Sequence, residues 1–169
     1  SALPYRVVGG TKFYERAEIK DAFGYLVAIS NRKDDLALRR ILNVPKRGIG
    51  DASETQIAKF AEKNDLSVRE VLANVTDMGF GPKITSSVLQ LSDLLNELEA
   101  MIETATVDEI LRAALGRSGL LDALKASRDP QDEARVENLD ELVNVAKEFQ
   151  RNNPEGKLPD FLNEVALVA

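Results

Sequence analysis

The sequence predicts an all-α domain of eight or nine helices, and two observations indicate this class. Apolar residues recur three or four positions apart along most of the chain, which is the spacing of one face of an α-helix. Residues 3–8 are typical of a short strand that ends at Gly9 and Gly10, and no second convincing strand follows to pair with it. With 169 residues the chain forms one large domain or two small ones, long enough to bury a substantial core.

Apolar periodicity and the turn residues between periodic segments predict the helices in order. We expect them over residues 13–31, 36–42, 52–63, 65–73, 84–102, 107–115, 119–125, 134–151 and from about residue 159 onward. Asp34 or Asp35 should cap the second helix, and residues 126–132 should form a polar loop. The fifth helix carries a coiled-coil type seam that should pack inside the domain, formed by Ile84, Val88, Leu91, Leu95, Leu98 and Ile102.

The composition excludes many kinds of enzyme. Cysteine and histidine are both absent, which removes disulfides, thiolate metal sites, Cys or His nucleophiles and histidine acid–base chemistry. No G-x-x-x-x-G-K-[ST] run is present to wrap the phosphates of ATP, so we expect no catalytic, cofactor-binding or metal-binding residue in this chain. No apolar run approaches the ~18 residues of a membrane span and no signal peptide opens the chain, which predicts a cytoplasmic protein without membrane contact.

Charge is distributed unevenly along the chain, whose formal net charge is −6. Residues 1–50 hold ten Lys/Arg against five Asp/Glu, a net charge of +5, and residues 51–169 hold twelve against twenty-three, a net charge of −11. Exposed charges more than about a Debye length apart are screened at physiological salt. A local basic edge can therefore bind phosphate on an otherwise acidic protein.

The loop over residues 45–51 is the strongest candidate for a binding site. Gly48 and Gly50 can adopt positive φ and let a ligand approach the backbone, while Ile49 between them can turn inward and anchor the loop to the core. The helix over residues 52–63 then directs its unpaired N–H groups and the positive end of its dipole back toward the loop. This arrangement is suited to holding a phosphate.

Four flanking residues complete this candidate site. Lys46 and Arg47 add two mobile positive charges, and Asp51 and Ser53 are candidate N-caps of the next helix. With its apolar flanks the segment approximates a helix-hairpin-helix, with Arg47 where that motif usually has proline. Backbone donors and cations together indicate contact with a DNA backbone that is independent of base sequence. The alternative interpretation is a plain helix–helix turn with two solvated cations.

A second pair of glycines repeats the pattern further along the chain. Gly79, Phe80 and Gly81 are followed by proline, Lys83 and a helix. One interpretation is a second phosphate-binding hairpin formed by Gly79, Gly81 and Lys83. The favoured interpretation is a helix start at which Phe80 fills core, because only one cation accompanies this loop.

Four segments resemble, in the same order, the UvrD/PcrA/Rep family of superfamily 1 DNA helicases. Residues 4–21 (PYRVVGGTKFYERAEIKD) look very like the stretch just after helicase motif IV, and residues 43–50 (NVPKRGIG), 135–142 (RVENLDEL) and 161–167 (FLNEVAL) follow. The resemblance covers essentially the whole chain and is highly specific. Within the family it favours the Gram-positive PcrA branch and its actinobacterial UvrD-like relatives.

This resemblance implies that residues 11–169 are the helical accessory subdomain called 2B, and that residues 1–10 are a strand of the RecA-like motor domain 2A into which 2B is inserted. Both ends should then continue into a larger helicase whose domains 1A, 1B and 2A are neighbours and bind ATP and Mg²⁺. In the family the G-I-G loop contacts the backbone of the duplex ahead of the fork, which matches residues 48–50 with Asp51 and Ser53 at the helix start. The subdomain swivels between open and closed positions, and this controls unwinding.

The leading hypothesis is a duplex-contacting regulatory module of an ATP-dependent 3′ to 5′ DNA helicase of repair and replication, associated with the bacterial nucleoid. Its expected partners are double-stranded DNA, single/double-strand junctions and repair or replication proteins. The fragment alone should bind DNA weakly and have no ATPase or helicase activity. The alternative is a protein-interaction and autoinhibitory module with only minor DNA contact, consistent with the acidic remainder of the chain. A third hypothesis is a stand-alone helix-hairpin-helix DNA-binding protein.

Overall fold

The computed structural model describes residues 11–169, and it confirms the all-α class. This part of the chain contains ten α-helices, one 3₁₀ helix and no strand. The predicted strand over residues 3–8 lies outside the described residues. The elements are α2 (Thr11–Glu15), α3 (Ala17–Ser30), α4 (Asp35–Ile41), α5 (Asp51–Lys63), α6 (Val68–Ala73), η1 (Val75–Met78), α7 (Pro82–Ala100), α8 (Val107–Arg117), α9 (Leu120–Ala126), α10 (Pro130–Asn152) and α11 (Leu158–Val168).

The helix predicted over residues 13–31 is broken in two, which accounts for the additional α-helix. The break falls at Arg16, which has extended backbone angles of φ −66° and ψ 141°. Its Nη1 donates to Oδ1 of Asn138 on α10 at 2.7 Å, and its guanidinium lies 5.7 Å from the centre of the Phe13 ring. The apolar periodicity continues through this point, so the sequence pattern does not reveal the break, which coincides with a tertiary contact.

Local sequence explains where several other helices begin. Asp34 caps α4, as predicted, by accepting a backbone hydrogen bond of 3.0 Å within the first turn. Ser67 and Glu70 form a reciprocal capping box at the start of α6. Asp129 caps α10 and Pro130 occupies its first turn. Helix α10 therefore begins four residues earlier than predicted, and the polar loop before it is shorter than expected.

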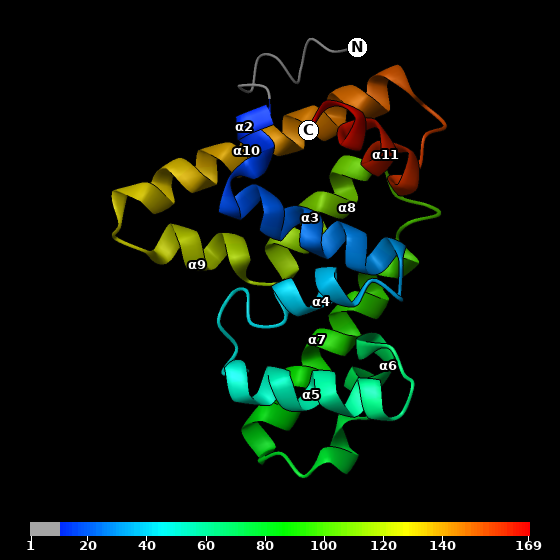
Figure 1. Cartoon of the computed structure of the whole chain (residues 1–169). Coiled ribbons are helices and arrows are strands. Elements are labelled where there is room, and N and C mark those ends of the chain that lie inside the picture. Colours follow the sequence, from blue (N-terminus) through cyan, green and yellow to red (C-terminus); the bar gives the residue numbers. More distant parts are fainter. Residues whose placement is uncertain (1–10) are drawn as a thin grey trace.

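Helix α3 lies at the centre of the molecule and packs against α2, α4, α7, α8, α10 and α11 (Figure 1). Its residues Ile19, Tyr25 and Leu26 are fully buried, at 0% exposed. Gly24 permits close contact with α4, because a Cβ at this position would stand 2.8 Å from Cγ2 of Ile41. The position of α3 therefore determines where α4 and the loop after it can lie.

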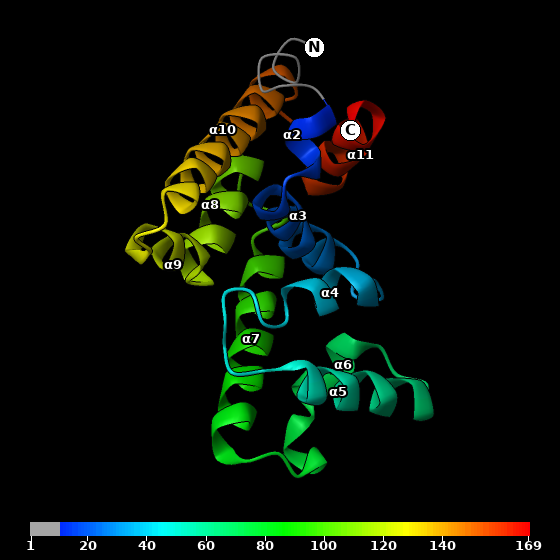
Figure 2. The same ribbon diagram turned by 60° about the vertical axis from the view of Figure 1, so that its left-hand side comes forward.

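Figure 2 shows α7 running from the lower part of the molecule to the middle, and there it packs against α3 and α8. The buried part of the predicted seam consists of Val88, Leu91, Leu95 and Leu98. Ile84 is only partly buried, and because the helix ends at Ala100, Ile102 follows the helix and does not extend the seam. The central four positions of the predicted seam are thus confirmed as core.

Two groups of helices lie at the two ends of α7 (Figures 1 and 2). The upper group contains α2, α8, α9, α10 and α11, and the lower group contains α5, α6 and η1, with α3 and α4 in between. The segment over residues 42–50 leaves α4 and descends along the outside to the start of α5 (cyan in Figure 1). The candidate loop therefore connects the middle layer to the lower group.

Replacing Leu95 by alanine should lower the free energy of unfolding by about 2–5 kcal/mol, because the cavity left by a fully buried leucine cannot collapse completely. The matched control is Leu36→Ala on α4, where the side chain is 81% exposed. This change should alter stability by less than about 0.5 kcal/mol. Urea unfolding followed by circular dichroism measures both effects, and equal effects would contradict the placement of Leu95 in the core.

Candidate nucleic-acid interface

The loop between α4 and α5 is held from the inside by two side chains. Oδ1 of Asn43 accepts the backbone N–H of Arg47 at 2.6 Å and that of Ile49 at 3.2 Å. Ile49 is 1% exposed, so it turns into the core as predicted. One amide and one aliphatic side chain thus anchor the loop and leave its outer edge without side chains.

Gly48 and Gly50 form this outer edge, and both are exposed. Gly48 has φ +79°, a conformation that favours glycine, and a Cβ added at either position would meet nothing within 4 Å. Gly50 is extended, with φ −75° and ψ −177°, so only the first of the two glycines uses positive φ. The backbone of this edge is therefore open to a ligand.

Helix α5 begins without a side-chain cap. Its N-cap residue is Gly50, and Asp51 and Ser53 lie inside the first turn, so the prediction that either residue caps the helix was wrong. The N–H groups of this turn therefore lack a side-chain partner at the N-cap and, with the positive end of the dipole, favour an anion. The exposed carboxylate of Asp51 lies at the same end, where it stabilises the helix and competes with an incoming phosphate.

Lys46 and Arg47 use their charges differently. Lys46 is exposed and makes no ion pair with a described residue. Nη1 of Arg47 donates to the carbonyl oxygens of Ile41 at 2.7 Å and Leu42 at 3.1 Å. Its Nη2 donates to the hydroxyl of Tyr25, and its guanidinium lies 5.9 Å from the centre of the same ring. Arg47 thus ties the loop to α3 and α4 and is not the mobile charge that the sequence predicted.

Tyr25 is the buried end of this contact. Its hydroxyl donates to the carbonyl oxygen of Val44 and accepts from Arg47. Burial raises the pKa of Tyr25, while the charge of Arg47 and hydrogen bonds from Arg47 and Ser118 act in the opposite direction. The neutral phenol therefore serves both as donor and as acceptor, and it links α3 to the loop. The sequence offered no pattern by which to pair these two positions, which are 22 residues apart.

The second glycine pair adopts the same backbone arrangement. Gly79 has φ +74°, and Gly81 is the extended N-cap of α7, with φ −62° and ψ 164° and no side-chain cap. Phe80 between them is partly buried and packs against the core, which agrees with the favoured interpretation of this segment as a helix start. Lys83 is exposed in the first turn of α7. The two glycine loops therefore share a conformation, and both precede an uncapped helix.

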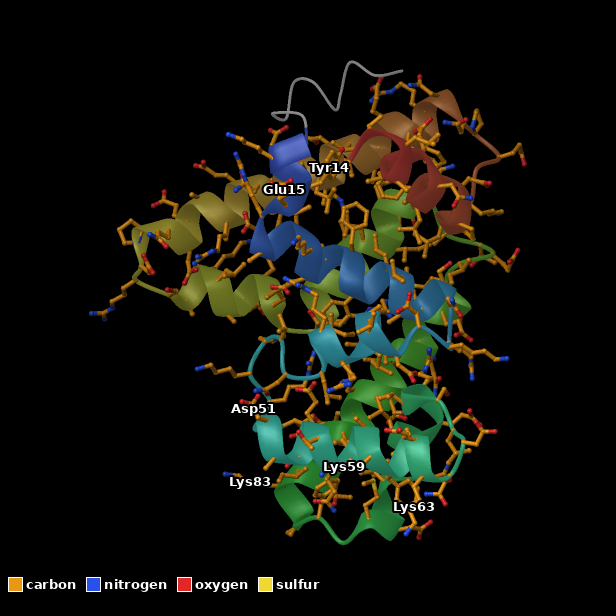
Figure 3. The ribbon with its side chains drawn as sticks, in the orientation of Figure 1. Tyr14, Glu15, Asp51, Lys59, Lys63 and Lys83 are labelled. Carbon is orange, nitrogen blue, oxygen red and sulfur yellow. The ribbon has the colours of Figure 1, made fainter. Side chains whose placement is uncertain are left out.

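Figure 3 shows Asp51 and Lys83, which lie in the first turns of α5 and α7, on the same side of the lower helix group. Lys59 and Lys63 also project from α5 in this view, and both are exposed. Neither lysine was among the residues predicted for the site. Their spacing of four residues on the polar face of an amphipathic helix was the pattern that could have revealed them.

Ion pairs neutralise several cations of the basic N-terminal region. The pairs are Arg32 with Glu99 at 2.7 Å, Arg39 with Glu54 at 3.1 Å and Arg40 with Asp21 at 2.9 Å. Because Arg47 is also engaged, Lys46 is the described cation of this loop that remains open to solvent. The net charge of residues 1–50 thus overstates the positive charge available at the edge of the loop.

A cluster of metal ligands and the P-loop motif are both absent from residues 11–169. Residues 11–169 contain no group of three or more His, Cys, Asp or Glu side chains that could hold a metal ion. The chain has no G-x-x-x-x-G-K-[ST] run for the phosphates of ATP. No helix in the described part of the chain is long and apolar enough to cross a membrane.

Comparison with known proteins identifies the family. The model of the UvrD-like helicase C-terminal domain matches residues 1–169, and the chain belongs to this family. The ATP-dependent DNA helicase PcrA of Staphylococcus epidermidis is 40% identical over 171 residues, covering 100% of this chain and 24% of that protein. PcrA of Staphylococcus aureus is 37% identical, covering 100% of this chain and 23% of that protein. The resemblance to the UvrD/PcrA/Rep family is thus confirmed, and the chain spans about a quarter of the length of these relatives.

Replacing Arg47 by alanine should lower the free energy of unfolding by about 2 kcal/mol, because two carbonyl oxygens and the Tyr25 hydroxyl lose their donor in a partly buried site. Lys46→Ala is the matched control, since it removes a neighbouring charge that makes no ion pair with a described residue. It should change stability by less than about 0.5 kcal/mol. Urea denaturation of the two variants measures the difference. Two variants of equal stability would show that Arg47 does not hold the loop.

Proposed function

We propose that this chain is the 2B-type regulatory module of an ATP-dependent DNA helicase, and that it contacts the backbone of duplex DNA without reading the bases. The observation that carries the proposal is the bare edge formed by Gly48, Gly50 and the uncapped start of α5, with Lys46 beside it. The PcrA relatives, which are named ATP-dependent DNA helicases, support the same class of ligand.

The chemistry of the edge favours phosphate over bases. Backbone N–H groups at a helix start and a lysine ammonium are donors that recognise phosphate oxygens. Direct readout of base pairs requires side chains long enough to enter a groove. Gly48 and Gly50 have no side chain, and Ile49 is buried, so residues 48–50 present only backbone to the DNA. Binding should therefore be independent of sequence.

The second glycine loop provides a further contact in this proposal. Gly79, Gly81 and Lys83 repeat the arrangement of the first loop at the start of α7. Nε2 of Gln56 on α5 donates to the carbonyl oxygen of Met78 at 3.4 Å, which joins the second loop to the helix that follows the first. Two phosphate contacts held in one rigid unit would fix the orientation of the duplex better than one. Lys59 and Lys63 would extend the positively charged surface of Lys46 and Lys83 along α5.

Affinity should nevertheless be weak. Asp51 opposes an anion at the start of α5, Arg47 is engaged within the loop, and each lysine contributes only a screened surface charge. Non-specific binding of this kind has a Kd of about 10⁻⁴ to 10⁻⁶ M at physiological salt. Such an affinity suits a module that modulates the binding of a larger enzyme to DNA.

ATP and Mg²⁺ would be bound by the rest of the helicase in this proposal, which is consistent with the missing G-x-x-x-x-G-K-[ST] run and with residues 11–169, where no group of three His, Cys, Asp or Glu side chains could hold a metal ion. Residues 1–10 would be a strand of motor domain 2A, residues 11–169 the 2B subdomain, and domains 1A, 1B and 2A its neighbours. Unwinding in the 3′ to 5′ direction would be powered by those domains. The 169-residue chain alone is then expected to hydrolyse no ATP and to unwind no DNA.

A second candidate function is a protein-interaction and autoinhibitory module, and the surface of α10 favours it. One face of this helix carries four exposed carboxylates, none of which makes an ion pair with a described residue: Glu133, Glu137, Asp140 and Glu141. Such a face repels DNA and is suited to a basic surface on another protein or on another domain of the same helicase. DNA contact would then be minor.

Replacing Lys46 by glutamine, or Lys83 by glutamine, should weaken binding to a labelled duplex with a 3′ single-stranded tail. Each change removes one phosphate contact, so the slope of log K against log salt should become shallower by about one. Fluorescence anisotropy at several salt concentrations, starting well below physiological salt, measures both quantities. Arg47 is left intact, since its loss would disturb the loop.

Arg151→Gln is the charge-matched control. Arg151 is exposed near the end of α10 in the upper helix group, and among residues 11–169 it pairs only with Glu148 of its own helix. This variant should bind like the wild type. If all three variants bind alike, or if the wild type does not bind at low salt, the glycine loops are not a duplex clamp and the interaction module becomes the better proposal.

A further inference from the structure

A polar cavity of about 680 Å³ lies where the turn between α3 and α4 meets α6 and α7. The charged residues that line it are Arg32, Lys33, Arg69 and Glu70. In Figure 1 the α3–α4 turn and α6 lie to the right, whereas the loop that leads to α5 lies to the left. The cavity is therefore separate from the proposed DNA-binding edge.

Arg69 is the unusual residue of this cavity, because its side chain is only 4% exposed. Its Nη2 donates to Oδ1 of Asn96 at 2.8 Å. Its Nη1 lies 3.4 Å from Oε1 of Glu99 but makes no hydrogen bond with a described residue. Burial lowers the pKa of Arg69, and the nearby carboxylate of Glu99 opposes this effect. A buried guanidinium with an N–H group that no protein acceptor meets is costly, and an anion or a water molecule in the cavity can satisfy it.

The carboxylate of Glu99 is already used by a second arginine. Nε of Arg32 donates to Oε1 and Oε2 of Glu99 at 2.9 and 3.0 Å, and its Nη2 donates to Oε2 at 2.7 Å. Two guanidinium groups therefore share one carboxylate, which leaves one positive charge uncompensated. Lys33 adds a further cation, and the Glu70 carboxylate, which accepts from the backbone N–H and hydroxyl of Ser67, offsets it. The positive charge left over in the cavity is therefore the one that Arg32 and Arg69 share.

Two neutral side chains that line the cavity keep unused donors, although Glu70 and Asn74 also place acceptor oxygens in its lining. Asn96 gives its carbonyl oxygen to Arg69, so its amide NH₂ is left over. The hydroxyl of Ser92, a residue that is 5% exposed, makes no hydrogen bond with a described residue. Together with the guanidinium of Arg69 and the ammonium of Lys33, these groups match the oxygens of an anion. The volume falls within the range of about 300–1,000 Å³ typical of small-ligand pockets.

We propose that this cavity binds a small oxyanion, a phosphate or carboxylate group carried by a low-molecular-weight ligand. Arg32, Lys33 and Arg69 supply the positive charge, and Ser92 and Asn96 supply neutral donors. A guanidinium matches either kind of anion through paired N–H groups. Duplex DNA is a poorer fit, because the exposed carboxylate of Asp93 on α7, which makes no ion pair with a described residue, repels an extended polyanion. The proposal does not depend on the proposed function.

The test is a two-dimensional NMR titration of the 169-residue chain with sodium phosphate and, separately, with sodium succinate, each at constant ionic strength set by sodium chloride. Saturable shifts of the amides in α6 and the second half of α7 are expected. Arg32→Gln should weaken the affinity roughly tenfold, because it removes the surplus charge and leaves buried Arg69 paired with Glu99. Arg39→Gln removes an exposed arginine outside the cavity that is also paired with a glutamate, and it should leave the affinity unchanged.

Glu99→Gln makes the opposite change and should tighten anion binding, since both guanidinium groups then lack their carboxylate. Phosphate should raise the Tm of this variant more than that of the wild type. Tighter binding of phosphate than of succinate would indicate a phosphorylated ligand, and the reverse order a carboxylate ligand. The proposal is overturned if neither anion gives saturable shifts, if Arg32→Gln and Arg39→Gln behave alike, or if short duplex DNA shifts the same amides more strongly than either anion.

Discussion

The burial of α3 among six other helices is the constraint on which the rest of this structure depends. Gly24 lets α4 approach α3 closely, and Tyr25 next to it extends to the segment after α4. Arg47 closes this contact by satisfying the last carbonyl groups of α4 and the Tyr25 hydroxyl together. The core of the protein therefore positions the outer edge of the loop, although Gly48 and Gly50, which form this edge, are exposed.

This anchoring bears on the proposed contact with a phosphate backbone. Ordering a flexible loop on binding would cost conformational entropy. Here the Asn43 amide and buried Ile49 hold the loop before any ligand arrives, so its backbone donors need little reorganisation. The loop at Gly79 and Gly81 should likewise lose little conformational entropy on binding, because Phe80 packs against the core. An anchored, bare backbone with few free cations is consistent with the weak, sequence-independent DNA contact proposed for these loops.

Ion pairing, more than the number of charged residues, determines where the protein carries net positive charge. Arg39 and Arg40 are neutralised by carboxylates of other helices, which removes them from the basic region near the candidate loop. Near α6 and α7 the balance is reversed, because Arg32 and Arg69 share the single carboxylate of Glu99. Ion pairing thus lowers the net positive charge near the candidate loop. In the cavity between α6 and α7, which the sequence did not reveal, a positive charge remains unpaired.

The sequence by itself determined the helical class, the buried centre of the α7 seam, the Asp34 cap and the inward turn of Ile49, because periodicity and capping depend on neighbours within a few residues. The tertiary structure alone decided the break at Arg16, the engagement of Arg47 and the cavity around Arg69. In each of these places an arginine meets partners from another helix, and Arg16 reaches Asn138 across 122 residues. A long cationic side chain can be solvated or paired with equal ease, and only the packing of the helices decides between the two.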